Sequence, residues 1–143
     1  MINKKIAIVT GGGSGIGYAI AQKFIENLNE KINQWSSKLN SLKGKNIITY
    51  HKSLNYLSLW TGLSVVNTIE PKPGIPPSSK RMKELTETIK TQNVSLIVME
   101  EFYPSSFAKN LATETGIKLV IIKTQINGSY TDLMENILNS LSN

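Results

Sequence analysis

The sequence of 143 residues contains no cysteine, and its only histidine is His51 and its only aspartate Asp132. Without cysteine, the chain cannot form a disulfide framework, a cysteine-based zinc ribbon or a thiol nucleophile, and its compartment cannot be read from redox chemistry. A single imidazole cannot make a histidine-rich metal site, because zinc sites use three or four ligands. Any metal site would therefore need carboxylates or a second polypeptide.

Long apolar runs and clustered positive charge are also absent. No run approaches the ~20 apolar residues that a membrane span needs, and the apolar residues 6–9 are too few for a signal peptide. The net charge of +6 is spread along the chain, without the clustered Lys/Arg and interleaved aromatics of a nucleic-acid binder. We interpret the one dense basic stretch, Lys80, Arg81 and Lys83, as a solvated helix face, and expect no nucleic-acid partner.

The hydrophobic pattern alternates short β-branched runs with longer helical stretches, which is typical of βαβ units around a parallel sheet. With 40% hydrophobic residues, the chain can bury the core of one globular domain. We expect an α/β fold with a parallel sheet of about four strands flanked by helices, preceded by a βα unit that runs into a long helix. Strands are expected at residues 5–10, 46–50, 65–69, 95–100 and 118–122, and shorter helices at residues 53–61, 78–92, 104–115 and 130–141.

The strongest helical signal covers residues 15–42, where apolar residues recur every three or four positions and form one stripe. Such a helix is about 42 Å long at 1.5 Å per residue, which is more than a crossover in a small sheet requires. We therefore expect it to span more than one compact lobe and to end at Gly44. The stripe consists of Ile16, Ile20, Phe24, Leu28, Ile32, Trp35, Leu39 and Leu42.

Glycine and proline mark two loops. Four of the five prolines fall within residues 70–78, which predicts an extended, stiff loop at the carboxyl end of a strand. Ligands of open α/β sheets bind at that end. Ser78 or Ser79 is expected to cap the helix that follows, and Gly62 and Gly116 each stand just past a helical stretch.

A glycine-rich segment with Gly11, Ser14, Gly15 and Gly17 follows the first expected strand. Small residues there would let backbone N–H groups approach a pyrophosphate at a helix N-terminus. Residues 6–24, IAIVTGGGSGIGYAIAQKF, resemble the opening of the short-chain dehydrogenase/reductase family. The resemblance implies NAD(P) binding by these four residues. No tyrosine has a lysine four residues later, so we expect no catalytic residue and no enzyme, and a tight turn without nucleotide remains the other interpretation.

A second set of motifs begins near residue 28. It comprises residues 39–56, LNSLKGKNIITYHKSLNY, then TGL at 61–63, NTIEPKPGIPPS at 67–78, MEEF at 99–102, ATETGIK at 112–118, and an ending with Tyr130, Met134, Asn136 and Leu138. These motifs resemble the metal-binding solute receptors of bacterial ABC importers for zinc and manganese. The resemblance covers about 115 of the 143 residues in order.

This resemblance implies two α/β lobes joined by one long helix, with a metal ion between the lobes. It makes residues 1–24 a dehydrogenase-like leader, residues 25–43 the connecting helix and residues 44–143 the carboxy-terminal lobe. The histidine after the Thr-Tyr strand is a metal ligand in such receptors, and here it is His51. Glu70 and Glu100, at the ends of expected strands, are the other candidate ligands.

The expected function is binding of zinc or manganese for ABC-type transport, by a truncated or fused half-receptor whose site is incomplete. The implied partner is an ABC permease, and the implied location is the periplasm or cell surface, although the chain has no signal peptide and would be cytoplasmic if expressed as given. The alternative is an NAD(P)-binding, dehydrogenase-like fragment without catalytic residues. The apolar helix stripe would also allow a homodimer.

Overall fold

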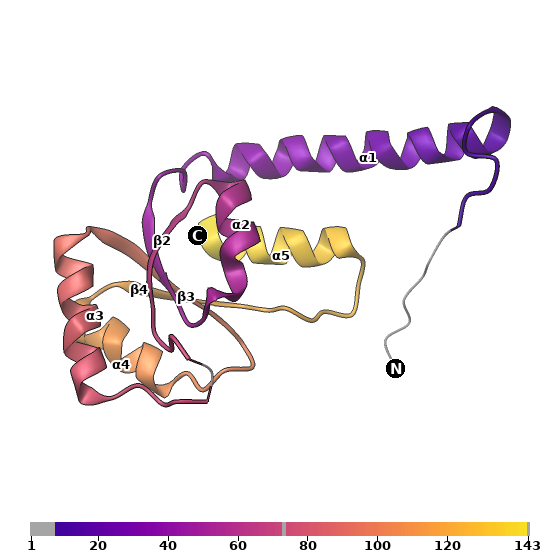
Figure 1. The fold of residues 1–143 in the computed structure, drawn as a ribbon. Helices are drawn as coiled ribbons and strands as arrows, with labels where there is room; N and C mark the ends of the chain where they lie inside the picture. Colours follow the sequence, from indigo (N-terminus) through magenta and orange to yellow (C-terminus); the bar gives the residue numbers. More distant parts are fainter. Residues whose placement is uncertain (1–7, 73, 143) are drawn as a thin grey trace. The chain divides into compact units, whose positions relative to one another are not determined.

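The computed structural model describes residues 8–72 and 74–142 (Figure 1). The chain divides into two compact units, Met1–Trp35 and Ser36–Asn143. The first unit holds most of helix α1 (Gly15–Leu39), and the second holds the sheet and the remaining helices. The boundaries predicted after residues 24 and 43 stay predictions.

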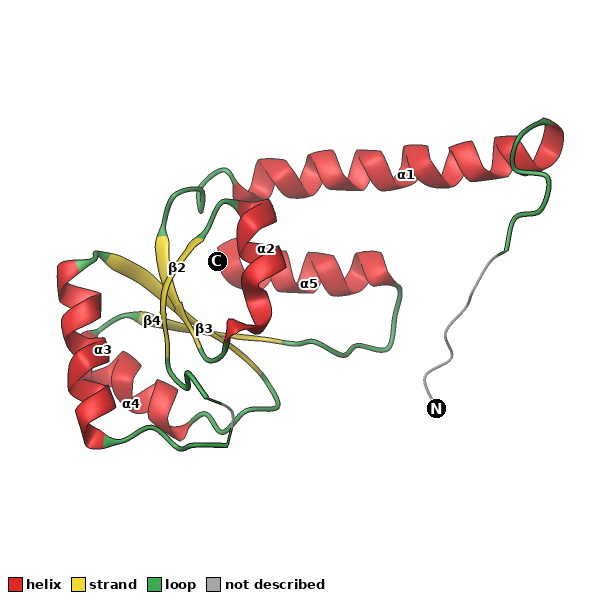
Figure 2. Cartoon of the chain, in the orientation of Figure 1, coloured by secondary structure: helices red, strands yellow, loops and turns green. Residues whose placement is uncertain are grey.

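The described part of the second unit contains a sheet of four parallel strands in the order β2-β1-β3-β4 (Figure 2). The α/β prediction with a parallel sheet of about four strands is confirmed. Each strand begins or ends within one residue of its expected bounds. The strands are β1 (Asn46–Thr49), β2 (Ser64–Thr68), β3 (Val94–Glu100) and β4 (Lys118–Ile122).

A helical segment follows each strand, as the alternating pattern predicts. Helices α3 and α4 lie on one side of the sheet, and α2 and α5 lie on the other (Figures 1 and 2). Ser78 accepts a hydrogen bond from the Arg81 N–H and caps α3, and Gly62 and Gly116 end α2 and α4 in the left-handed conformation. The segments are η1 (Lys52–Leu54), α2 (Asn55–Thr61), α3 (Ser79–Thr91), α4 (Ser106–Thr115) and α5 (Tyr130–Ser142).

The core explains why the strands are apolar almost without interruption. Alternate residues of β1 and β3, among them Ile48, Ile97 and Met99, pack with Leu85 of α3 and Leu111 of α4. The intervening strand residues are buried as well, because the opposite face is also covered by helices. Parallel sheets with both faces covered have such strands. The core leaves the carboxyl ends of the strands as the place where polar side chains collect.

Two predictions about the amino-terminal region need correction. Helix α1 ends at Leu39 rather than Leu42, because a turn follows in which the Leu42 N–H donates to the Leu39 carbonyl at 2.9 Å. Leu42 is still buried, so its apolar character reflects the lobe and not the helix. Of the first expected strand, residues 8–10 form no strand, and residues 5–7 lie outside the described residues. A strand is stable only beside a partner, and the described sheet pairs only β1 to β4.

The apolar stripe of α1 changes character along its length. Ile16, Ile20, Phe24 and Leu28 are exposed, whereas Leu39 and the following Leu42 are buried. Among the described residues, no helix combines the length and the apolar character needed to cross a membrane.

Candidate functional site

The three candidate ligands from the sequence lie at one edge of the sheet. His51 follows β1, Glu70 follows β2 and Glu100 ends β3. The chain passes from β1 outward to β2 and then back to β3 on the other side of β1, so the connections diverge at this edge. Ligands of open α/β sheets bind in the crevice outside such a divergence. The topology therefore puts these side chains where a ligand is expected.

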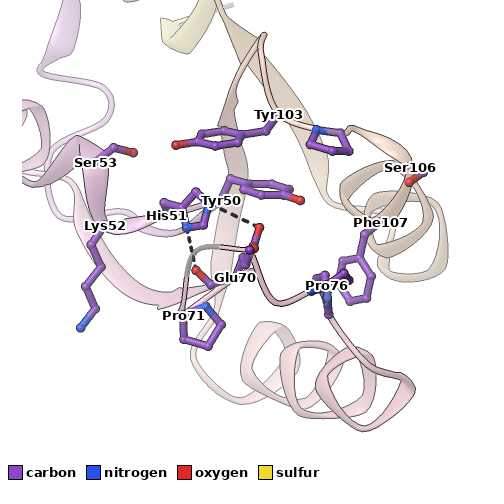
Figure 3. A pocket seen from close by; sticks show the side chains of 13 residues that line it. Tyr50, His51, Lys52, Ser53, Glu70, Pro71, Pro76, Tyr103, Ser106 and Phe107 are labelled. Carbon is purple, nitrogen blue, oxygen red and sulfur yellow. Dashed lines mark hydrogen bonds and ion pairs between the residues drawn. The ribbon is translucent and has the colours of Figure 1, made fainter.

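His51 and Glu70 face each other because the register of their strands requires it. Thr49 is paired with Thr68, and His51 and Glu70 each stand two residues further along. The ladder continues past both strands, since the Glu70 N–H donates to the Tyr50 carbonyl at 2.9 Å. The His51 Nδ1 lies 2.8 Å from the Glu70 carbonyl oxygen, and Nε2 lies 3.4 Å from Glu70 Oε2 (Figure 3). Both side chains are about nine-tenths buried.

The hydrogen bond at Nδ1 fixes which ring nitrogen faces Glu70. A carbonyl oxygen can only accept, so Nδ1 carries a hydrogen, and Nε2 presents its lone pair whenever the ring is neutral. That lone pair faces a carboxylate oxygen, an arrangement that calls for a proton or a cation between the two atoms. Ligand atoms bound about 2.0–2.2 Å from a tetrahedral zinc ion lie about 3.4 Å apart. The observed 3.4 Å separation therefore suits two ligands of one ion.

Two tyrosines hold the imidazole from the sides. The rings of Tyr50 and Tyr103 stack at 4.8 Å, and His51 meets Tyr103 edge-on at 4.6 Å. Burial raises the pKa of Tyr50, and the charge of Glu70 and a hydrogen bond to it raise that pKa further. Burial, then Glu100 and Glu70, likewise raise the pKa of Tyr103. Both phenols stay neutral at physiological pH, and the Tyr50 hydroxyl helps to fix the Glu70 carboxylate.

A pocket of about 760 Å³ opens beside this pair (Figure 3). The proline-rich loop forms one wall with Pro71, Pro76 and Pro77, as its predicted place at the carboxyl end of a strand implies. Pro104 and Phe107 contribute a second apolar wall after β3. His51 and Glu70 are thus reached from solvent through an apolar opening with rigid sides.

Glu100 is placed differently from the other two candidates. It is 2% exposed, its Oε1 accepts a hydrogen bond from the Ser53 hydroxyl, and its Oε2 has no hydrogen-bond partner among the described residues. Within residues 8–72 and 74–142, no group of three or more His, Cys, Asp or Glu side chains is arranged to hold a metal ion. The structure brings His51 and Glu70 together, and it does not add Glu100 to them as a third member of one site.

Sequence reasoning missed Arg81. The interpretation of the basic stretch as a solvated face fits Lys80 and Lys83, which are exposed, but it is wrong for Arg81. The Arg81 side chain is 19% exposed, and its guanidinium lies against the end of β2. Spacing in the sequence could not reveal this, because it depends on how the first turn of α3 docks on the sheet.

The glycine-rich loop has a structural explanation of its own. Gly11 and Gly15 have positive φ values of 65° and 59°, and a Cβ atom on Gly17 would collide with the carbonyls of Thr10 and Gly11. The Ser14 N–H donates to the Gly11 carbonyl at 3.3 Å, and α1 begins at Gly15. The turn itself requires these glycines, whereas NAD(P) binding by Gly11, Ser14, Gly15 and Gly17 stays a prediction.

Comparison with known proteins agrees with the motifs that begin near residue 28. The family model described as "ZnuA: Zinc-uptake complex component A periplasmic" matches residues 18–143. The chain belongs to this family. Its members are metal-binding solute-binding proteins and not enzymes, so the predictions of family and of a non-enzyme are confirmed. The family match does not include residues 1–17.

Individual relatives of the ZnuA family give the same picture. The zinc-binding lipoprotein AdcA of Streptococcus pneumoniae is 30% identical over 130 residues, which cover 85% of this chain and 26% of that protein. The zinc uptake protein ZnuA of Bacillus subtilis is 28% identical, with 85% and 41% covered. The manganese complex of FpvC from Pseudomonas aeruginosa superposes with a TM-score of 0.64 at 25% identity, covering 85% of this chain and 47% of FpvC. The chain thus spans less than half the length of these relatives.

Proposed function

We propose that this chain binds a divalent transition-metal ion, zinc or manganese, for ABC-type uptake. His51 Nε2 and Glu70 Oε2 are two of its ligands in this proposal. The observation that carries it is their separation of 3.4 Å, with Nδ1 held as the donor to a carbonyl. Neutral imidazole and carboxylate suit both metals, and zinc should bind more tightly than manganese in a site of given geometry.

Two ligands make an incomplete site, since transport and structural zinc sites use three or four. The other ligands come from outside the described group, from water, a further part of the receptor or a second chain. Glu100 could join only if its carboxylate left the Ser53 hydroxyl. We therefore expect this chain alone to bind zinc only in the roughly micromolar to millimolar range.

Calorimetric titration with zinc tests the proposal. His51→Ala should abolish the heat of binding, and Glu70→Gln should weaken binding about tenfold or more, because a charged ligand becomes a neutral amide. Glu101→Gln is the matched control, since Glu101 is exposed near the same edge and its loss removes the same charge. No heat at millimolar zinc would refute the proposal. If the Glu70 and Glu101 variants weaken zinc binding equally, Glu70 contributes only its negative charge and is not a ligand.

The transport setting follows from the family rather than from the site. The AdcA relative is a lipoprotein, and the family description is periplasmic. We propose on this basis that the chain works outside the cytoplasmic membrane and delivers its ion to an ABC permease. Copurification with a permease expressed from the same genome would test that partner.

We also propose that a second copy of this chain packs against the exposed part of α1. A row of apolar residues that shares the stripe from Leu28 onward alternates spacings of three and four, which is typical of paired helices. The positions that flank residues 18–32 of this row carry one charge, Lys31, so two copies would bring few like charges together there. The row runs through Tyr18, Ala21, Ile25, Leu28, Ile32, Trp35, Leu39 and Leu42. Trp35, Leu39 and Leu42 are already buried, so residues 18–32 form the part that a second copy would cover.

A further inference from the structure

The guanidinium of Arg81 binds the last residues of β2. Its Nη2 donates to the Thr68 carbonyl and, at 2.6 Å, to Asn67 Oδ1, and its Nε donates to the Ile69 carbonyl at 3.5 Å. Its Nη1 pairs with Glu84 on the next turn of α3 at 3.1 Å. Arg81 therefore engages three consecutive residues, and Glu70 is the next in the chain.

These contacts supply hydrogen-bond donors to an edge strand, where a neighbouring strand would otherwise supply them. β2 is at the edge of the sheet, so its outward carbonyls have no neighbouring strand to bind. The planar arginine fork supplies several donors in a fixed geometry, which a lysine cannot do. The Asn67 side chain is fixed from its other side, because Nδ2 donates to Thr88 Oγ1 at 3.2 Å and Oδ1 accepts from the Thr68 N–H at 2.9 Å.

The same contacts close the base of the proline-rich loop. That loop leaves β2 at Glu70 and enters α3 at Ser79, so Arg81 joins its two ends. Glu70 supplies both the carbonyl that holds His51 Nδ1 and the carboxylate that faces Nε2. Any rotation of the backbone at residues 68–70 would move both of these groups at once.

We propose that Arg81 is a positioning residue for the His51–Glu70 pair, fixing the imidazole tautomer and the separation of the two atoms through the end of β2. The part that concerns metal affinity rests on the proposed function. The part that concerns the tautomer does not, because it describes the metal-free protein.

The sign of the effect separates positioning from electrostatics. Removing a positive charge near a cation site should strengthen cation binding, if charge alone matters. Removing a residue that orients the ligands should weaken it, by about tenfold or more. Lys80→Ala and Lys83→Ala are matched controls, since both lysines are exposed on the same helix and each removes one positive charge.

The experiment measures zinc affinity by calorimetry, and the ¹⁵N spectrum of the metal-free His51 ring at an alkaline pH where the ring is neutral, in the wild-type chain and four variants. Arg81→Ala should bind zinc about tenfold more weakly and give a mixed-tautomer ring signal, while Lys80→Ala and Lys83→Ala bind as well as wild type or better and keep the Nδ1–H signal. Arg81→Lys should fall between them, because it keeps the charge and loses the fork. His51 is the only histidine, so the ring signal has one source.

An unchanged ring spectrum in both Arg81 variants would overturn the proposal, as would affinities that rise with those of the lysine controls. If Arg81→Ala does not fold by circular dichroism, Arg81→Lys decides. If the wild-type chain shows no zinc binding, the proposed function fails, and the metal-free ring spectrum still decides whether Arg81 positions the pair.

Discussion

The two ends of α1 follow one apolar repeat but have opposite surroundings. Leu39 and the following Leu42 are 4% and 3% exposed within the second unit, whereas Phe24 and Ile25 are each 59% exposed in the first. Nothing in the spacing distinguishes the two ends. The repeat predicts the helix and the face that an interaction will use, and burial depends on what lies opposite that face.

The largest expected effect is on stability at the buried end. Leu39→Ala should lower the free energy of unfolding by about 2–5 kcal/mol, because it removes a core side chain and leaves a cavity. Leu28→Ala, the same substitution at a residue 42% exposed, should lower it by less than about 1 kcal/mol. Urea unfolding followed by circular dichroism measures both. Equal losses would mean that the first half of the row is covered as well as the second.

Two glycines, one in a loop of each unit, should respond differently in stability to substitution by alanine. Gly62 has a φ of 74°, and a Cβ there would lie 2.9 Å from Lys43 Cγ, so Gly62→Ala should cost about 1–2 kcal/mol. Gly12 lies in ordinary backbone with its nearest contact at 3.9 Å, so Gly12→Ala should be close to neutral. Melting temperatures of the two variants provide the measurement. A large loss for Gly12→Ala would show that the leader loop contributes to the stability of the chain.

The smallest expected effect on stability belongs to the exposed end, where the change should appear in association instead. Ile25→Asp should leave the free energy of unfolding of the monomer within about 0.5 kcal/mol of wild type and abolish any dimer, because it places a charge in the apolar row. Asn27→Asp adds the same charge at an exposed position outside the row. Light scattering over a range of concentrations compares them. A wild-type chain that is monomeric at high concentration would contradict the proposed dimer.

Local rules predicted most of the fold. The positions of β1 to β4, the helices that follow them and the Ser78 cap follow from apolar periodicity and end signals. Non-local contacts explain the failures. Leu42 extends the apparent helix because a turn can bury a leucine as well as a helix can, and residues 8–10 read as a strand although the described sheet offers them no partner.

The sequence names His51, Glu70 and Glu100 as candidate ligands, but it does not predict which of them lie together. His51 is predicted from the family resemblance, and Glu70 and Glu100 from their places at the ends of expected strands, without knowledge of which strands are neighbours. Once β1 and β2 are adjacent, the pairing of Thr49 with Thr68 brings His51 opposite Glu70, while Glu100 is held by Ser53. The contact between Arg81 and the end of β2 could not be predicted from strand order either, since it depends on how α3 approaches the edge of the sheet.

The fixed tautomer of His51 has a consequence for charge balance. A neutral imidazole and one carboxylate give the pair a charge of −1, so a divalent cation bound there keeps a charge of +1. The Glu100 carboxylate adds negative charge at the same edge, since it acts on Tyr103 beside the His51 ring. The ligands that complete the shell supply the remaining balance, since a buried, uncompensated charge is costly. A shell completed by neutral histidines alone would hold the ion less firmly and release it more readily.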